Sequence, residues 1–376
     1  MKKFIVLLLI LLALLIGSPA ASALTLNASA AVLIDATTGR LLFEQNSHEA
    51  LPPASTTKIL TAMLALESGL DLDSSVTLPD DFVNVGESGI YLEPGETHSL
   101  RDLLYALMLR SANDAAQAIA IAVCGSEEDF VEKMNQRTAE LGLTESHWRN
   151  AHGLNAEDHL ASAYDLAMIT KQALTIPFFN ELINTRSWTL PWSGNGYDRV
   201  LYNHNQFLDY YPGADGVKTG YTEPAGNCLV ASASREGMRL IGVVLNCPDQ
   251  THYETMAQLM NYGFENFQPL LVGEAGKTLA KVKVNQGELR EVDAVLAQNI
   301  IIAVPNGSKY SADLKPELPS ALTAPLDPQT AIGSVSFSDD QGHKIQTALY
   351  PKQVVERYTF GMVIMNAWQC FIGALL

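Results

Sequence analysis

The chain has 376 residues, of which 47% are hydrophobic, and a formal net charge of −17. This length fits two domains of roughly 150 residues each, and the hydrophobic content supports a sizeable core, which excludes wholesale disorder. The strong negative charge excludes nonspecific binding to nucleic acid, because that attraction depends on lysine and arginine.

The first 23 residues have the pattern of a secretory signal peptide. Lys2 and Lys3 precede an apolar run from Phe4 to Ile16, and the small residues Ala21-Ser22-Ala23 follow. This order predicts export and cleavage after Ala23, which removes both lysines and changes the net charge to −19. A retained membrane anchor is the alternative, but the apolar run is shorter than the ~20 residues that a spanning helix needs.

Residues 24–270 are predicted to form one α+β domain. Alternating apolar residues predict strands at both ends of this region, and apolar residues at three- and four-residue steps predict helices between them. We therefore expect one antiparallel sheet flanked by helices on both faces. The predicted strands are Ala31–Asp35, Leu41–Glu44, Gly216–Tyr221, Asn227–Ser234 and Met238–Leu245, and the predicted helices are Ile59–Leu66, Leu100–Leu109, Ala115–Val123, Glu127–Leu141 and Ala163–Ala173.

The rest of the chain is predicted to form a small β-rich domain over residues 276–352 and a membrane-associated helix over residues 354–376. No residue from Tyr358 to the C-terminus is charged, so this helix can span a bilayer marginally or lie in its plane. Burial as a terminal core helix is the alternative. The predicted strands of the β-rich domain are Leu279–Val284, Ile300–Val304, Gly333–Phe337 and Lys344–Leu349.

Four cysteines, Cys124, Cys228, Cys247 and Cys370, are too few for a disulfide scaffold. Cys228 and Cys247 lie on neighbouring predicted strands, where a disulfide is an option with unfavourable geometry. The chain has no CxxC motif and no cluster of histidines and cysteines, so we expect neither a metal nor a cofactor.

Three short motifs follow one another in the first domain: Ser55-Thr56-Thr57-Lys58, Ser111-Ala112-Asn113 and Lys218-Thr219-Gly220. Ser55 starts a predicted helix, so Lys58 lies one turn away on the same face. A serine hydroxyl becomes a good nucleophile when a neighbouring base takes its proton. Lysine can be that base if burial or a like charge lowers its pKa.

The second and third motifs also lie where a substrate cleft needs them. Ser111 and Asn113 occupy a short connection between two predicted helices, and Lys218 lies on a strand, where it can attract a substrate carboxylate. Gly220 has no side chain, so a substrate backbone can lie close to that strand. Each motif alone fits an ordinary role, such as a helix cap or an exposed strand lysine. Together, the three motifs predict a serine acyl-transfer site.

The motif set resembles that of the low-molecular-mass penicillin-binding proteins, the D-alanyl-D-alanine carboxypeptidases. The resemblance implies a β-lactamase/transpeptidase-like fold, and peptidoglycan stem peptides and β-lactam antibiotics as partners. The predicted signal peptide and the apolar tail together predict a location at the outer face of the cytoplasmic membrane. The resemblance covers nearly the whole chain and includes residues 31–35 with Gly39, 51–58, 103–114, 152–154, 164–166 and 212–222.

The resemblance implies a role for each motif residue. Ser55 attacks the penultimate D-Ala carbonyl and Lys58 accepts its proton. Ser111 relays a proton to the departing D-Ala, and Asn113 orients the substrate and Lys58. The residues implied in substrate binding are Lys218 and Thr219, which bind the terminal carboxylate, Gly220, and Tyr221, whose backbone N–H shares the oxyanion with that of Ser55.

Other features leave alternatives open. Tyr221 stands where many relatives have histidine, and His152 and Tyr164 are expected to be structural. A class A β-lactamase would need a glutamate for deacylation, and Glu181 is the candidate, but it lies much nearer the third motif than the second. A catalytically silent peptidoglycan-binding protein is disfavoured by the intact motifs, whereas endopeptidase action on crosslinks stays open.

Overall fold

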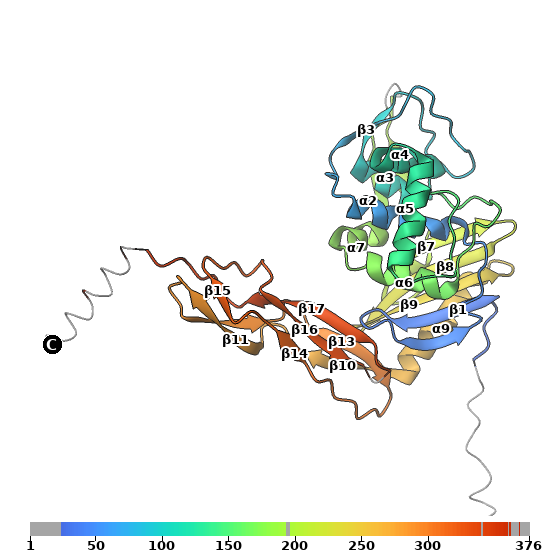
Figure 1. Ribbon diagram of the computed structural model, residues 1–376. Helices are drawn as coiled ribbons and strands as arrows, with labels where there is room; N and C mark the ends of the chain where they lie inside the picture. The colour runs from blue at the N-terminus through green and yellow to red at the C-terminus, as the bar shows by residue number, and fades with distance from the viewer. Residues whose placement is uncertain (1–23, 193–195, 340, 360, 362–367, 369–376) are drawn as a thin grey trace, which may run out of the picture.

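The computed structural model describes residues 24–192, 196–339, 341–359, 361 and 368. Residues 24–266 form a sheet–helix unit, and residues 267–359 form a β module that extends from it as an elongated arm (Figure 1). The predicted signal peptide lies outside the described residues, as does most of the predicted C-terminal helix. Among the described residues, no helix is long and apolar enough to cross a bilayer.

The sheet–helix unit is built on one five-stranded antiparallel sheet in the order β2-β1-β9-β8-β7. This order confirms the prediction that strands from both ends of the region share one sheet. The N-terminal hairpin pairs through β1 with β9, which leaves β7 as an edge strand. The strands are β1 (Ala30–Asp35), β2 (Leu41–Gln45), β7 (Ala214–Thr222), β8 (Gly226–Arg235) and β9 (Met238–Cys247).

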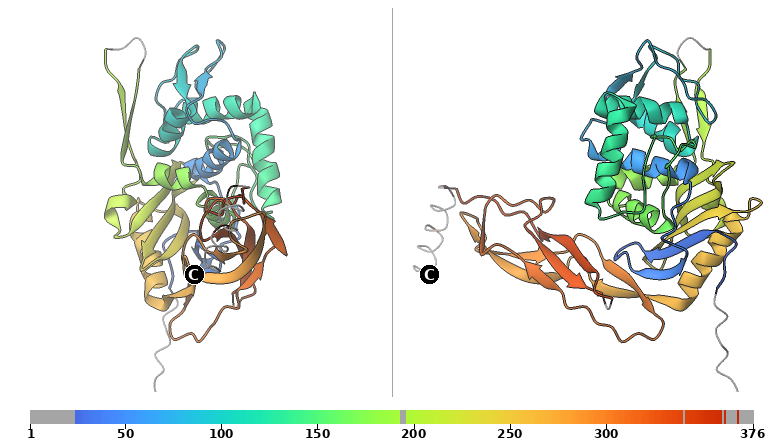
Figure 2. Two further views of the ribbon diagram at one scale, coloured as in Figure 1. Left: turned by 90° about the vertical axis from the view of Figure 1, so that its left-hand side faces the viewer. Right: turned by 45° about the vertical axis from the view of Figure 1, so that its right-hand side comes forward.

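Helices cover both faces of the sheet, as expected (Figure 2). Strand β1 shows why: Val32 and Ile34 face one core cluster and Ala31 and Leu33 face the other, so every residue of the strand is buried. The helices are η1 (Ala54–Thr57, 3₁₀), α2 (Lys58–Glu67), α3 (Leu100–Leu109), α4 (Asn113–Cys124), α5 (Glu127–Glu140), α6 (Ala163–Ala173), α7 (Pro177–Asn184), α8 (Phe207–Tyr210) and α9 (His252–Asn266).

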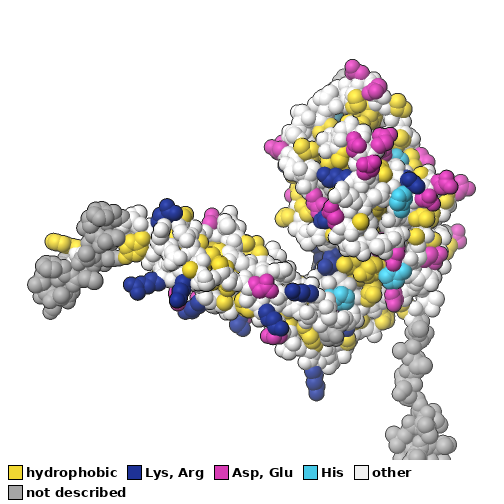
Figure 3. Space-filling model, viewed as in Figure 1, with side chains coloured by type: hydrophobic (Ala, Val, Ile, Leu, Met, Phe, Trp, Pro, Cys, Tyr) yellow, Lys and Arg dark blue, Asp and Glu magenta, His cyan; other side chains and the backbone are white. Residues whose placement is uncertain are grey.

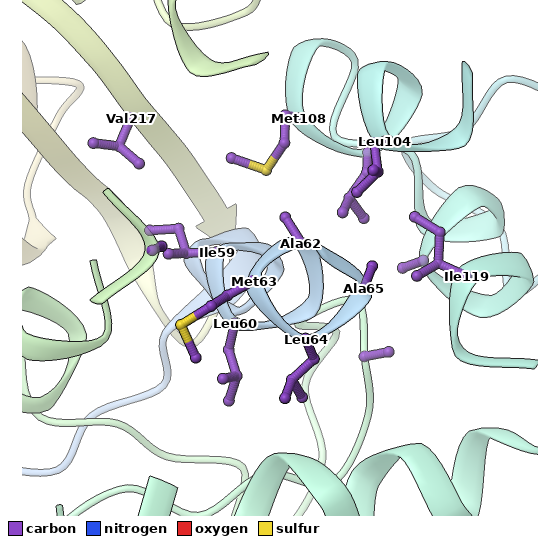
Figure 4. Packing of buried hydrophobic residues seen from close by; sticks show 14 of the residues in the cluster. Ile59, Leu60, Ala62, Met63, Leu64, Ala65, Leu104, Met108, Ile119 and Val217 are labelled. Carbon is purple, nitrogen blue, oxygen red and sulfur yellow. The ribbon is translucent and has the colours of Figure 1, made fainter. Parts of the chain in front are cut away.

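Helix α2 lies in the middle of the larger core cluster. Its residues Ile59 to Ala65 are all buried, and side chains from α3, α4 and β7 surround them (Figure 4). A helix that is apolar on all sides needs such an enclosed position. The first turn of α2 is thereby fixed beside the edge strand β7.

Helix α9, which the sequence analysis did not predict, packs closely on the opposite face. A Cβ at Gly263 would lie 2.6 Å from side-chain atoms of Leu33 and Leu240, so glycine lets the helix approach the sheet. Met256, Leu259 and Met260 are buried at three- and four-residue steps, a period that was readable in the sequence.

Several short elements between the long ones were also not predicted. They include α7, α8 and two small hairpins, β3 (Ser75–Thr77) with β4 (Thr97–Ser99), and β5 (Ser187–Leu190) with β6 (Arg199–Tyr202). Helix α7 has eight residues and the others have three or four, which is too few to establish a period, so packing against the larger helices decides these elements.

The β module contains all four predicted strands. A six-stranded sheet has the order β14-β16-β17-β12-β11-β15, and β10 pairs with β13 beside it. The strands are β10 (Phe267–Gly273), β11 (Thr278–Asn285), β12 (Glu291–Val295), β13 (Ile300–Pro305), β14 (Lys315–Glu317), β15 (Ala321–Thr323), β16 (Gly333–Ser338) and β17 (Lys344–Pro351). Strands β10, β12, β14 and β15 were missed, the last two because three-residue strands show no alternation.

Candidate active site

Ser55 and Lys58 meet at the junction of η1 and α2. Ser55 lies in the 3₁₀ turn and Lys58 is the first residue of α2, so the Lys58 Nζ atom comes to 3.0 Å from Ser55 Oγ. Ala54, just before the serine, has a φ of 48°, a left-handed conformation that is costly for a residue with a side chain. Backbone strain of this kind persists where the surrounding structure fixes it, and it often marks functional sites.

Two further oxygen acceptors hold the Lys58 amine. Lys58 Nζ donates to Asn113 Oδ1 at 2.8 Å and to the backbone carbonyl of His152. The same loop is fixed one turn further along α2, where Thr61 Oγ1 donates to the Ala151 carbonyl at 2.6 Å. The Lys58 side chain is fully buried, so all its polar contacts are within the protein.

Burial and a nearby like charge both favour the neutral form of the Lys58 amine. Removal from water is the largest cause that lowers the pKa of the Lys58 amine well below 10.5, and the nearby Lys218 lowers it further. The carboxylates of Asp114 and Glu87 oppose this effect. Desolvation also lowers the pKa of Lys218, to about 7. Two nearby amines thus lie in a region that disfavours charge on both.

The connection between α3 and α4 forms one wall of the site. Ser111 has a φ of 60° and is 7% exposed, and within the described residues its hydroxyl has no hydrogen-bond partner. Asn113 starts α4 and is held by a loop, since its Nδ2 atom donates to the Gly86 carbonyl at 3.0 Å and its backbone N–H to the Ser88 carbonyl at 2.8 Å. The Asn113 amide nitrogen is therefore committed to the loop, and the oxygen faces Lys58.

Strand β7 forms the opposite wall. A Cβ at Gly220 would lie 3.0 Å from the Ser55 backbone nitrogen, so this position must be small for the strand to reach the serine. Lys218, two residues earlier on the same face of the strand, is 1% exposed and donates to the Thr219 carbonyl at 2.9 Å. Thr219 is half-buried and Tyr221 is exposed.

The structure thus gathers Ser55, Lys58, Asn113, Lys218 and Gly220 around one point. It places Ser111 on one adjoining wall and Thr219 and Tyr221 on the other. The His152 carbonyl and the loop at residues 84–92 were missed, because a backbone acceptor and an irregular loop leave no motif. The sequence had singled out His152 only as a structural residue.

The remaining candidates have other partners. Glu181 lies on α7 and accepts a hydrogen bond from the Tyr105 hydroxyl at 2.9 Å, and burial together with this carboxylate raises the pKa of Tyr105 to about 12. Tyr164 is the second residue of α6, and its ring lies 4.9 Å from that of His48. Cys228 and Cys247 are both free thiols, so the disulfide option does not occur in the structure, and Cys370 lies outside the described residues.

No group of three or more His, Cys, Asp or Glu side chains in the described part of the chain is arranged to hold a metal ion.

The fold and this cluster place the chain in the class of α+β proteins with the architecture of penicillin-binding proteins. Within that class, it belongs to the D-alanyl-D-alanine carboxypeptidase family, whose model matches residues 18–249. A second model, described as the C-terminal domain of penicillin-binding protein 5, matches residues 267–357. The chain is therefore an enzyme, a serine peptidase with D-alanyl-D-alanine carboxypeptidase function.

Individual relatives agree with this assignment. The D-alanyl-D-alanine carboxypeptidase DacF of Bacillus subtilis is 33% identical, with 99% of this chain and 100% of the relative covered. Penicillin-binding protein 5 of Haemophilus influenzae is similar in structure, with a TM-score of 0.65, 28% identity and coverage of 90% of this chain and 100% of that one. A peptidoglycan synthesis regulatory factor (PBP3) of Streptococcus pneumoniae gives a TM-score of 0.69, 27% identity and coverage of 89% and 100%.

Proposed function

We propose that the enzyme removes the terminal D-Ala from peptidoglycan stem peptides through an acyl-enzyme on Ser55, with Lys58 as the general base. The observation that carries this proposal is the 3.0 Å separation of Lys58 Nζ and Ser55 Oγ in a buried setting. A neutral amine has two N–H donors and one lone pair. Asn113 Oδ1 and the His152 carbonyl accept the two donors, and the lone pair is left for the Ser55 hydroxyl.

In the proposed acylation, each proton that one group loses is taken up by another. Ser55 Oγ attacks the carbonyl carbon of the penultimate D-Ala while its proton passes to Lys58. The backbone N–H groups of Ser55 and Tyr221 hold the oxyanion, and the loss of one such donor costs about 3–4 kcal/mol where it has been tested in a serine peptidase. The C–N bond breaks, the leaving amine takes a proton through Ser111, and free D-Ala departs. Water then hydrolyses the Ser55 ester.

Strand β7 binds the carboxyl-terminal end of the peptide. Lys218 supplies positive charge for the terminal carboxylate, and the half-buried Thr219 hydroxyl adds a donor. Gly220 lets β7, an edge strand of the sheet, lie close to Ser55, and an extended peptide can add main-chain hydrogen bonds to such an edge. One N–H of the Asn113 amide is bound to Gly86 and the oxygen accepts from Lys58, so the second N–H is the group offered to the substrate. A β-lactam carries a carboxylate and an acyl group in a similar arrangement, so it would acylate the same serine.

We also propose that the enzyme works outside the cell, held at the outer face of the cytoplasmic membrane by the apolar tail. The apolar, uncharged C-terminal sequence supports this location. Residues 24–266 carry 13 Lys and Arg against 31 Asp and Glu, whereas residues 267–359 carry 9 against 10. On the face in Figure 3, acidic side chains gather over the sheet–helix unit and basic ones over the β module. An anionic membrane surface would repel the first unit more strongly than the second.

Mass spectrometry of a synthetic pentapeptide that ends in D-Ala-D-Ala tests the proposal. The wild type should release one D-Ala and accept a fluorescent penicillin covalently, and Ser55→Ala should do neither. Lys58→Ala should lower the acylation rate by about 10²–10⁴-fold, the usual contribution of a positioned base. The half-buried Lys133→Ala, on α5, is the matched lysine control and should keep wild-type rates. Penicillin labelling of Ser55→Ala at the wild-type rate would contradict the assignment of the nucleophile.

A further inference from the structure

Asp114 is a buried carboxylate next to the active site. Its side chain is fully buried and accepts hydrogen bonds from the backbone N–H groups of Ile90 and Leu92 at 3.0–3.2 Å and from Asn84 Nδ2 at 3.0 Å. The Ala115 N–H donates to it as well, at 2.9 Å. A buried carboxylate is costly unless its lone pairs are used, so this set of donors explains why it is tolerated.

Three of these donors belong to one loop, residues 84–92, which lies between β3 and β4. The loop has no helix or strand of its own, and two of its residues, Glu87 and Tyr91, have φ values of 57° and 60°. A loop of this kind has few backbone hydrogen bonds to hold its shape. Asp114 therefore accepts hydrogen bonds from loop N–H groups that, in a helix or a strand, would bond to backbone carbonyls.

The same loop orients Asn113. The Gly86 and Ser88 carbonyls accept from the Asn113 side chain and backbone at 3.0 and 2.8 Å. With its nitrogen bound to Gly86, the Asn113 amide has to present its oxygen to Lys58, 2.8 Å away. Two consecutive residues of α4 thus act in sequence: Asp114 holds the loop, and the loop holds Asn113.

We propose that Asp114 is a positioning residue for acyl transfer, because its carboxylate anchors residues 84–92 and so fixes the Asn113 amide with its oxygen toward Lys58. This inference rests on the proposed function, in which Lys58 is the base for Ser55. If the loop loses its anchor, Asn113 can turn its nitrogen toward Lys58, and the lysine loses one of the two acceptors that direct its lone pair at the serine.

The loop side of the contact offers an independent probe. A Cβ at Gly89 would lie 3.0 Å from Asp114 Oδ2, and the φ of Gly89 is outside the left-handed region, so alanine is acceptable to the backbone there. Gly89→Ala should therefore push the loop away from Asp114 without changing any charge or any residue of α4.

The experiment compares Asp114→Asn and Gly89→Ala with a matched control, Asp165→Asn. Asp165 is also a buried carboxylate in the first turn of a helix, and it accepts a loop N–H from Glu145 at 3.1 Å, but it does not contact Lys58 or Asn113. We expect Asp114→Asn to lower the acylation rate constant with fluorescent penicillin by about 10–100-fold, with the binding step before acylation nearly unchanged. Gly89→Ala should lower it in the same way but less, and Asp165→Asn should change it less than about threefold.

The pH profile of acylation separates positioning from general damage. Lys58 is faced by Lys218 on β7, by Glu87 in the loop, by Asp114 on α4, and by His152 and His159, whose burial lowers their pKa values to about 3 and about 4. Because the Asp114 carboxylate raises the pKa of Lys58, Asp114→Asn should move the acid limb to lower pH. Gly89→Ala keeps the Asp114 charge, and Glu87 in the displaced loop is the smaller of the two acidic influences on Lys58, so this variant should lower the rate and move that limb less than Asp114→Asn does.

Two results would overturn the inference. One is wild-type acylation by Asp114→Asn. The other is an equal loss of acylation in Asp165→Asn at an equal loss of melting temperature. Neither result contradicts the proposed function. That function would be contradicted by a different result, release of D-Ala from the pentapeptide by Ser55→Ala at the wild-type rate.

Discussion

Two buried lysines define the site at the scale of single residues. Lys58 and Lys218 are 0% and 1% exposed, and burial is the largest cause of the lowered pKa of each amine. Their assigned tasks need opposite protonation states, since a base must be neutral and a carboxylate binder must be charged. The pKa of Lys58 is lowered well below 10.5 by burial and by the like charge of Lys218, which favours the neutral form that a base needs.

This division predicts an alkaline limb in kcat/KM. Lys218 has a pKa of about 7, so it loses its proton, and its attraction for a carboxylate, as the pH rises through that value. We expect kcat/KM for a peptide ending in free D-Ala to fall by up to tenfold per pH unit above about 7. The same peptide with an amidated terminus is the control and should show a lower value without this limb. Equal pH profiles for both peptides would show that Lys218 does not bind the terminal carboxylate.

At the scale of secondary-structure elements, two glycines from different segments contact the backbone of η1. A Cβ at Gly153 would lie 2.0 Å from the Ala54 carbonyl oxygen, and a Cβ at Gly220 would lie 3.0 Å from the Ser55 nitrogen. The loop after α5 and strand β7 therefore both contact the backbone of the nucleophile directly. Such contacts fix the turn around Ser55 more firmly than side-chain packing can, because backbone atoms cannot choose another rotamer.

Gly153→Ala tests whether these backbone contacts hold η1 in place. Gly153 has a φ of 90° and no space for a methyl group, so we expect the free energy of unfolding to fall by about 2–4 kcal/mol and acylation to slow at least tenfold. Gly142→Ala is the control: its φ is 76°, but nothing lies within 4 Å of the added Cβ. It should lower the free energy of unfolding by about 1 kcal/mol, from backbone strain alone, and leave acylation unchanged. Urea titration measures the free energy of unfolding, and penicillin labelling measures the acylation rate. Equal losses of both quantities in the two variants would show that the backbone contacts do not hold η1 in place.

At the scale of the whole molecule, strand β13 joins the two units. Ile300, Ile302 and Val304 belong to the core of the β module, whereas Ile301 and Ala303 pack against the sheet–helix unit. The Ile301 carbonyl also accepts from Thr37 Oγ1 at 2.8 Å. Because side chains alternate along a strand, one strand serves two cores, which fixes the direction of the arm.

Ile301→Ala should loosen this junction. Removing a half-buried isoleucine should reduce the stability of the junction by about 1–2 kcal/mol, less than at a fully buried site. We expect a larger radius of gyration in small-angle X-ray scattering and two separate transitions in calorimetry. Ile302→Ala, one residue along and facing the other core, should lower the melting temperature of the β module with unchanged scattering of the folded protein. Identical scattering for Ile301→Ala and the wild type would contradict the role of β13.

The sequence by itself determined much of this protein. It specified the three motifs, the strands and helices with a clear period, one sheet built from both ends of the first region, and the family, because these depend on local periodicity and on residue types at short spacing. Helix α9 and strand β12 were missed although their buried residues follow a readable period.

Only the tertiary structure decided which groups surround the nucleophile. Lys58 meets Asn113 across 55 residues and the His152 carbonyl across 94, and the Asp114 carboxylate meets a loop without regular structure. The depressed pKa values of the two lysines likewise follow from enclosure between α2, α4 and β7. Periodicity carries no information on such contacts, because they depend on how distant segments pack and on backbone atoms that every residue shares.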